Sequence, residues 1–295
     1  MKRIYADLVL LSIAFIWGVT FPVIKIALAS ISPFMFNTVR FFIASILFVP
    51  FFLSKRFNPS TTSVGDIKTG ILIGIAVFLG YTFQTAGIEL TTATNAGFIT
   101  STYVVFTPLI AMFLFKARVS RREIFFVITA FAGLYLLSGF SAEFSYGDIL
   151  ILLCAVAFAF EIVLISHFSR IKSPIYLAFG QVLTVAILST PLSIVAYRFE
   201  LSRDVAVALL ITAVFATTLA RIAQNHAQKF TRSTDAAIIF SMEGVFSHIL
   251  AIFMLGESLT FTEYAGAGLI VLSVIGISLS ESTQKKIPQD TQKLK

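Results

Sequence analysis

Charged, proline and polar residues divide the chain into ten apolar stretches, each as long as a helix that crosses a lipid bilayer. Such a helix needs about 20 predominantly apolar residues. The stretches are 6–29, 33–54, 67–88, 94–115, 122–140, 147–168, 174–197, 204–226, 234–255 and 261–280. Short loops separate them, and the only long polar segment is 281–295. The sequence therefore predicts an all-α membrane protein with ten transmembrane helices and no soluble domain.

The composition excludes a water-soluble alternative. Charged residues make up 13% of the chain and hydrophobic residues 57%, whereas a soluble protein carries roughly 25% charged residues. A single cysteine, Cys154, excludes a disulfide framework and a thiolate metal cluster. His226 and His248 lack a third ligand at metal spacing, and no nucleotide-binding loop occurs. We expect neither a metal nor a cofactor.

The basic residues predict the orientation in the membrane. With a cytoplasmic N-terminus, 17 of the 22 Lys and Arg lie inside, Arg198 and Arg203 lie outside, and three lie within spans. Cytoplasmic loops are enriched in Lys and Arg, so both termini are predicted to be cytoplasmic. The same bias explains the net charge of +7 without a nucleic acid partner. The first span shows no cleavage site and is interpreted as a retained helix of a multi-pass protein of the cell (inner) membrane.

The two halves of the chain resemble each other. A shift of 140 residues aligns 84–123 with 224–263 without a gap, and eleven of these 40 positions are identical. A shift of 141 pairs Ser32-Pro33 with Ser173-Pro174 and Pro50 with Pro191. The chain is therefore interpreted as two five-helix units, 1–141 and 142–281, followed by a cytoplasmic tail, 282–295.

An odd number of helices places the second unit in the membrane upside down. The charges agree, because basic Lys116–Arg122 aligns with 256–262, which has no basic residue, and Glu89 aligns with Lys229. Inverted repeats are typical of secondary transporters, whose substrate site lies near the membrane midplane between the repeats. We expect alternating access to a small-molecule solute, with the site between spans one, three, four, six, eight and nine.

The chain also resembles the EamA-like family of the drug/metabolite transporter superfamily. The resemblance covers nearly the whole chain and is carried by Phe15-Ile-Trp17-Gly18, Phe21, Lys25, Arg40-Phe41, Ala96, Pro108, Gly256-Glu257-Ser-Leu-Thr260, Gly266 and Gly268. The sequence departs from the family pattern at Lys116-Ala117, where Gly-Glu is frequent, and at His248, where a second proline is expected opposite Pro108. Members move amino acids and other metabolites, mostly outward, so the resemblance implies a solute exporter.

Ionisable side chains within the spans are candidates for function, because they are costly in hydrocarbon. Lys25 lies near the outer end of span one, where it either reaches the headgroups or has a functional partner. Arg40 either bonds backbone carbonyls of a neighbouring helix or clamps a carboxylate. Glu161, Arg221 and Glu243 lie at similar depths in spans six, eight and nine. One arginine cannot neutralise two carboxylates, so one of the two is expected to take up and release a proton. A static ion pair is the alternative.

The other candidates for substrate contact are polar or aromatic. Tyr81 and Gln84 are three residues apart and share a helix face, as do Arg221 and Gln224. The repeat places Tyr81 opposite Arg221, and Tyr103 opposite Glu243. We predict that Trp17, Arg40, Tyr81, Gln84, Tyr103, Arg221, Gln224 and Glu243 bind substrate, with Glu161 and Glu243 as candidates for proton coupling. Interhelical packing is the alternative for the glutamines and aromatic residues.

Three classes of function remain. The first is a secondary exporter of amino acids or similar small metabolites. The second is a transporter of phosphorylated solutes such as nucleotide sugars, which two buried acids against Arg221 disfavour. The third is an intramembrane enzyme using Glu161 and Glu243, for which the chain offers no activated nucleophile. We therefore expect no enzymatic activity, and the oligomeric state is left open.

Overall fold

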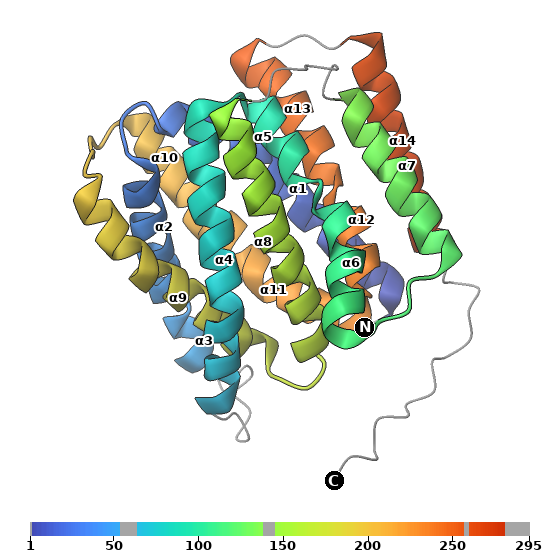
Figure 1. Ribbon diagram of the computed structural model, residues 1–295. Coiled ribbons are helices and arrows are strands. Elements are labelled where there is room, and N and C mark those ends of the chain that lie inside the picture. Colours follow the sequence, from blue (N-terminus) through green and yellow to red (C-terminus); the bar gives the residue numbers. More distant parts are fainter. Residues whose placement is uncertain (1, 54–63, 138–144, 257–259, 281–295) are drawn as a thin grey trace.

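The computed structural model describes residues 2–53, 64–137, 145–256 and 260–280, most of which are helical. The first half contains α1 (Arg3–Ala27), α2 (Pro33–Leu47), α3 (Val49–Leu53), α4 (Val64–Leu90), α5 (Ala93–Thr100), α6 (Tyr103–Phe115) and α7 (Arg121–Leu137). The second half contains α8 (Tyr146–Phe168), α9 (Pro174–Val195), α10 (Arg203–Leu210), the π-helix η1 (Ile211–Leu219), α11 (Ala220–Ala227), the 3-10 helix η2 (Gln228–Phe230), α12 (Ser233–Phe240), α13 (Met242–Leu255) and α14 (Phe261–Ser280). They form a helical bundle (Figure 1).

Nine stretches of the described chain are helical, apolar and long enough to cross a membrane. They are Arg3–Ala27, Pro33–Phe52, Gly65–Leu90, Ala93–Phe115, Tyr146–Phe168, Pro174–Val195, Arg203–Phe230, Ser233–Met254 and Phe261–Leu279. Each matches one of the ten expected stretches. The tenth, 122–140, falls on α7, whose 17 residues end where the described segment ends. The all-α membrane fold predicted from the sequence is thereby confirmed.

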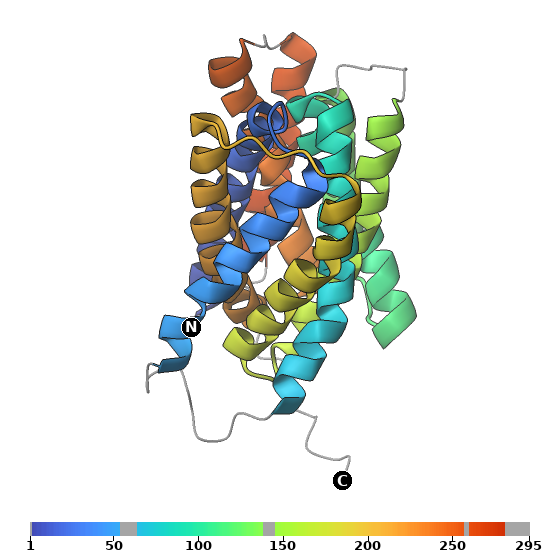
Figure 2. The same cartoon turned by 90° about the vertical axis from the view of Figure 1, so that its left-hand side faces the viewer.

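Helix starts follow from residues at the loop ends. Ser32 accepts a hydrogen bond from the backbone N–H of Met35, and Pro33 occupies the first turn of α2, where a missing N–H costs nothing. Ser145 and Asp148 form a capping box at the start of α8. Short, capped connections of this kind hold consecutive spans side by side, and the helices run between the two ends of the bundle (Figure 2).

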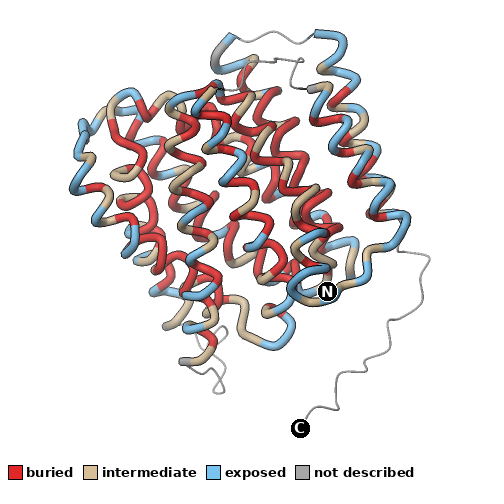
Figure 3. The backbone as a smooth tube through the Cα atoms, viewed as in Figure 1, coloured by how far each residue is buried: buried red, intermediate tan, exposed pale blue. Residues whose placement is uncertain are grey.

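Contacts between the two halves follow a regular pattern. Helix α1 packs against α13, and α8 packs against α5 and α6. Helix α4 packs against α8 and α9, whereas η1 and α11 pack against α1, and η1 also packs against α2. The remaining large contacts join α2 with α9 and α7 with α14. Exchanging the first five spans with the last five converts each of the other contacts into another of the set, and it leaves the α2–α9 and α7–α14 contacts unchanged. Buried residues lie along the facing sides of the inner helices (Figure 3).

Spans four and nine are both interrupted near their middle. Helix α5 ends before Ser101 and α12 before Ser241, two residues that are equivalent in the repeat. The Ser101 hydroxyl donates to the Gly97 carbonyl at 2.9 Å, and the Ser241 hydroxyl donates to the Ile238 carbonyl at 2.6 Å. Such bonds compete with the helical ladder and bend the helix. Broken helices at membrane depth mark binding sites in transporters.

Equivalent aspartates lie at the two ends of the bundle. Asp148 accepts a hydrogen bond from the Thr91 hydroxyl at 2.6 Å, and Asp7 accepts one from the Thr231 hydroxyl at 3.4 Å. Thr91 and Thr231 are 140 residues apart, and the aspartates are 141 apart. At the N-terminal end, Arg3 also bonds Asp235 at 3.0 Å. Each bond ties the start of one span to the loop that precedes the broken span of the other half.

The Lys25 side chain bonds to the protein backbone and does not extend to the lipid headgroups. Its Nζ donates to the backbone carbonyls of Ile88, Glu89 and Thr91 at 2.8, 3.0 and 2.7 Å. These carbonyls lie at the C-terminal end of α4, where a cation is favourable. The headgroup interpretation of Lys25 is therefore wrong, and the residue joins α1 to α4.

Three features of the sequence lie outside the described residues. They are the boundary between the two units at 141 and 142, the segment 257–259 within the Gly256–Thr260 motif, and the tail 282–295.

Candidate solute-binding site

Twelve residues from six spans surround a small internal cavity. They come from α1, α4, α6, α8, α11 and α13, which belong to the six spans expected to hold the site. The lining consists of Trp17, Thr20, Phe21, Tyr81, Gln84, Tyr103, Phe158, Glu161, Ile162, Arg221, Gln224 and Glu243. Seven of the eight residues predicted to contact substrate are among them, and so are both coupling candidates.

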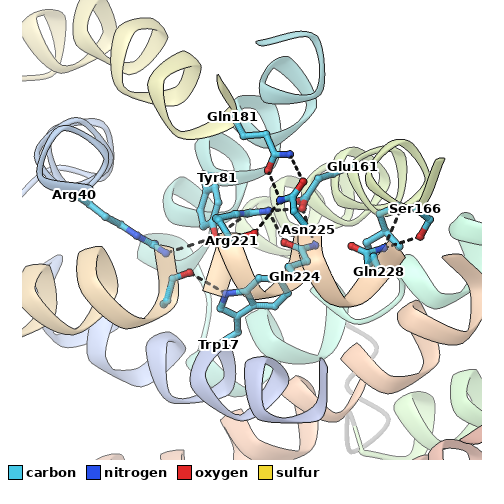
Figure 4. Close-up of polar contacts among 12 residues, drawn as sticks. Trp17, Arg40, Tyr81, Glu161, Ser166, Gln181, Arg221, Gln224, Asn225 and Gln228 are labelled. Carbon is cyan, nitrogen blue, oxygen red and sulfur yellow. Dashed lines mark hydrogen bonds and ion pairs between the residues drawn. The ribbon is translucent and has the colours of Figure 1, made fainter. Parts of the chain in front are cut away.

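Arg221 is the centre of the polar network (Figure 4). Its guanidinium pairs with Glu161, donates to Gln224 Oε1 at 3.0 Å and donates to the Tyr81 hydroxyl at 3.0 Å. Gln224 Nε2 in turn donates to Glu161 at 2.9 Å. Arg221 and Glu161 are only 1% and 2% exposed. The pair is therefore shielded from water, and of the two carboxylates Arg221 selects Glu161.

Glu243 has a different environment. It follows the break in span nine, is 3% exposed, and forms no ion pair with any described residue. The Tyr103 hydroxyl lies beside its carboxyl group. Neither that hydroxyl nor Glu243 Oε1 completes a hydrogen bond to a described protein atom. Tyr103 follows the break in span four, so the two broken helices bring these unsatisfied groups together.

Arg40 is the one predicted substrate residue that does not line the cavity. Its Nε donates to the Thr217 hydroxyl at 2.7 Å, and its Nη2 lies 3.5 Å from the Tyr81 hydroxyl. The guanidinium also lies 4.6 Å from the centre of the Tyr81 ring. Arg40 thus stands behind Tyr81 and binds side chains rather than the carbonyls considered from the sequence.

The amides and Trp17 lie on the cavity and also bond neighbouring helices. Gln84 donates to the Thr100 hydroxyl at 3.4 Å. The Trp17 indole N–H donates at 3.0 Å to the carbonyl of Ala216, in the π-helical segment η1. Single turns of π-helix are frequent at functional sites. These residues therefore both join neighbouring helices and line the cavity.

Sequence reasoning missed four lining residues, Thr20, Phe21, Phe158 and Ile162. Phe21 was noted only for its family resemblance. Phe158 is one of 32 phenylalanines, so nothing in the sequence separates it from those facing lipid. Thr217, which orients Arg40, lies in η1, and a π-helix shifts the register of side chains relative to the expected α-helix.

The centre of a water-sized sphere can move within a volume of about 20 Å³ in this cavity. One water molecule needs about 10–15 Å³ on this measure. The structure therefore shows a contracted site, and a metabolite requires the helices to move apart. The ionisable groups in and next to the cavity are two arginines, Arg40 and Arg221, and two glutamates, Glu161 and Glu243.

The profile of the EamA-like transporter family matches the chain twice, over residues 4–139 and 145–279. The chain belongs to the EamA-like transporter family. Together the two matches span nearly the whole chain, as does the resemblance noted from the sequence.

Relatives of this EamA-like protein are named as transporters. An uncharacterized transporter of Archaeoglobus fulgidus is 52% identical over 280 residues, covering 95% of this chain and 87% of the relative. A protein of Rickettsia bellii named S-adenosylmethionine uptake transporter is 27% identical over 255 residues, covering 84% of this chain and 85% of the relative. The family and these names indicate a membrane transporter rather than an enzyme.

A crystal structure of a protein shares this EamA-like fold. The alignment covers 95% of this chain and 98% of the other, with a TM-score of 0.75 and 17% sequence identity. At that identity the likeness supports the fold alone.

Proposed function

We propose that the protein is a secondary transporter of small solutes of the amino-acid class, which carry a carboxylate and a cationic group. The observation that carries this proposal is a set of buried polar atoms on residues that line the cavity, without a hydrogen-bond partner in the described chain: the Tyr103 hydroxyl, Glu243 Oε1 and Arg221 Nε. Buried polar groups are almost always satisfied. A solute with a carboxylate and a cation would satisfy groups of both signs.

The charge balance favours such a solute over a phosphorylated one. Arg221 lines the cavity and Arg40 lies next to it behind Tyr81, so two arginines balance the two glutamates when both are ionised, and a zwitterion then leaves the site neutral. A nucleotide sugar would bring at least two negative charges beside Glu161 and Glu243, and uncompensated buried charge is costly. The aromatic rings of Trp17, Tyr81 and Phe158 suit a cation or a planar group.

Alternating access supplies the movement that a contracted cavity requires. We propose that residues 1–141 and 142–281 are inverted repeats that rock against each other. The exchanged contacts between the two halves and the two matches to the family profile support this arrangement. The Thr91–Asp148 and Thr231–Asp7 bonds would then open in turn, one at each end of the bundle.

For the direction we propose export across the cell membrane, as expected from the sequence. Uptake is the second candidate, because relatives in Rickettsia bellii and Rickettsia prowazekii are named S-adenosylmethionine uptake transporters. S-adenosylmethionine itself combines a carboxylate with an ammonium and a sulfonium group, so it belongs to the proposed chemical class.

Reconstituted protein in vesicles tests the substrate class. We expect vesicles to exchange labelled S-adenosylmethionine or a labelled amino acid, and not a labelled nucleotide sugar. Alanine at Gln84 or Glu243 should abolish this exchange while the protein remains folded. Exchange of the nucleotide sugar alone would show that the proposed class is wrong. Adding a substrate gradient from either side gives the direction.

We further propose that Glu243 couples transport to protons. A buried carboxylate without a paired cation is costly, so Glu243 would hold either a proton or the cationic group of the solute, never both. A pH gradient across vesicles without a solute gradient should then drive net accumulation, and Glu243→Gln should only equilibrate the solute. If wild type also merely equilibrates it, Glu243 binds solute without coupling.

A further inference from the structure

Helices α6, α8 and α12 pack together at the N-terminal end of the bundle (Figure 1). A second cavity opens between them. Its free volume is about 220 Å³, roughly ten times that of the central cavity. The lining is Ala111, Phe115, Ala117, Arg118, Val119, Val163, Ser166, His167, Arg170, Arg232, Ser233 and Thr234. It contains three arginines and no carboxylate, so its chemistry is that of an anion site.

The arginine side chains of this cavity have N–H groups that are available to bind an anion. Within the described chain, Arg118 and Arg170 make no ion pair and no side-chain hydrogen bond. Arg232 pairs with Glu123 at 2.9 Å and donates to the Arg118 carbonyl at 2.6 Å. Two positive charges are therefore uncompensated around the cavity, and Arg232 positions the segment that carries Arg118.

The N-terminal end of helix α12 also borders the cavity. Helix α12 begins here without a side-chain cap, so the first backbone N–H groups are available to an acceptor. Thr234 lines the cavity, is 3% exposed, and its hydroxyl makes no hydrogen bond to the described protein. Phosphate oxygens accept from arginine, from hydroxyl groups and from helix N-termini.

The apolar surface beside the cavity indicates which kind of phosphate compound would bind there. On α6, Leu109, Met112 and Phe113 are 58%, 50% and 84% exposed, although α6 belongs to a membrane span. On α8, which packs against α6, Phe160 is 37% exposed. An apolar, lipid-facing surface therefore leads up to the basic cavity. We propose that this cavity binds the phosphate of an anionic phospholipid, in the leaflet that the charge bias assigns to the cytoplasm, with an acyl chain lying along α6 and α8.

The test counts lipids on the purified full-length protein by native mass spectrometry during titration with phosphatidylglycerol or phosphatidylcholine. We expect one tight phosphatidylglycerol molecule and no tight phosphatidylcholine. Arg118→Gln/Arg170→Gln should weaken it about 25-fold, at about fivefold for each arginine near a membrane surface. The control, Lys68→Gln/Arg121→Gln, removes two exposed charges of this end from outside the cavity and should leave the affinity unchanged.

Three results would overturn the proposal. They are equal binding of the two lipids by wild type, equal losses in both double variants, and displacement of the lipid by soluble glycerol 3-phosphate at the same concentration. The last result would assign the cavity to a soluble phosphate compound. Circular dichroism of both double variants checks the fold, and thermal melting with each lipid gives an independent readout, since only a protein with the intact site should be stabilised by phosphatidylglycerol.

Discussion

At the scale of single residues, the central site combines two opposite situations. Arg221 and Glu161 form a buried ion pair, whereas Tyr103 and Glu243 have polar atoms with no partner in the described chain. Breaking the ion pair would leave one buried charge uncompensated. The unsatisfied groups already cost stability, because a buried polar group without a partner loses its water without compensation. This difference allows binding to be separated from folding by mutation.

Tyr103→Phe tests the unsatisfied group. We expect the melting temperature to stay the same or rise, because the lost hydroxyl has no bond to lose. Solute affinity should fall about two- to tenfold, which corresponds to one hydrogen bond. Binding titration and thermal melting measure the two effects, and Tyr146→Phe, at an exposed tyrosine, is the control. A loss of stability with unchanged affinity would make Tyr103 a packing residue.

The ion pair is tested by restoring charge balance. Arg221→Gln leaves Glu161 buried without its cation and should lower stability by about 3–5 kcal/mol. Adding Glu161→Gln should recover most of that loss, because no buried charge remains unpaired. We expect transport to stay absent in the double variant. Recovery of transport together with stability would show that the pair is only structural.

At the scale of elements, close approach of α1 and α13 brings Trp17 and Glu243 to the same cavity. A Cβ atom on Gly18 would lie 2.5 Å from Phe246 Cβ and 3.0 Å from two backbone atoms of α13. Gly18→Ala should therefore push the helices apart and reduce both melting temperature and transport. Gly268→Ala is the matched control, because nothing lies within 4 Å of its Cβ position, and alanine favours a helix. Similar losses in both variants would show that the close approach of the helices at Gly18 is not the cause.

The hydrogen bonds at the two ends of the bundle should have opposite effects on access. Thr91→Val removes the bond to Asp148 with little change of shape, and Thr231→Val removes the equivalent bond to Asp7. In a Cys154→Ala background with Thr20→Cys in the cavity, an impermeant maleimide is applied from outside. Thr91→Val should label faster and Thr231→Val should not. Equal labelling would contradict alternate opening of the two ends.

At the scale of the whole molecule, the charge bias predicts that the N-terminal end faces the cytoplasm. The proposed lipid site depends on that prediction only for the choice of leaflet. A reporter enzyme that works only in the cytoplasm, fused after Lys295, should be active. A reporter that works only outside should be inactive at the same position. The reverse result would invert the topology and with it the direction proposed for transport.

The sequence by itself determined the fold class. Apolar length predicts membrane helices, because backbone groups in lipid must bond within their own helix, and nine of the ten expected stretches appear as such helices. It also indicated which spans meet, because polar residues in hydrocarbon must find one another. Glu161, Arg221 and Glu243 could be grouped at one depth on this basis alone.

Only the tertiary structure decided the partners within that group. Pairing of Arg221 with Glu161 rather than Glu243 depends on ångström-scale distances between separate helices, which spacing along one helix does not define. The π-helical turn at η1 rotates Thr217 toward Arg40, and a local sequence pattern cannot show it. Lys25 and the basic cavity are of the same kind. The carbonyl partners of Lys25 are more than 60 residues away, and the lining of the cavity comes from three separate segments, 111–119, 163–170 and 232–234. Long-range packing, rather than local propensity, sets these contacts.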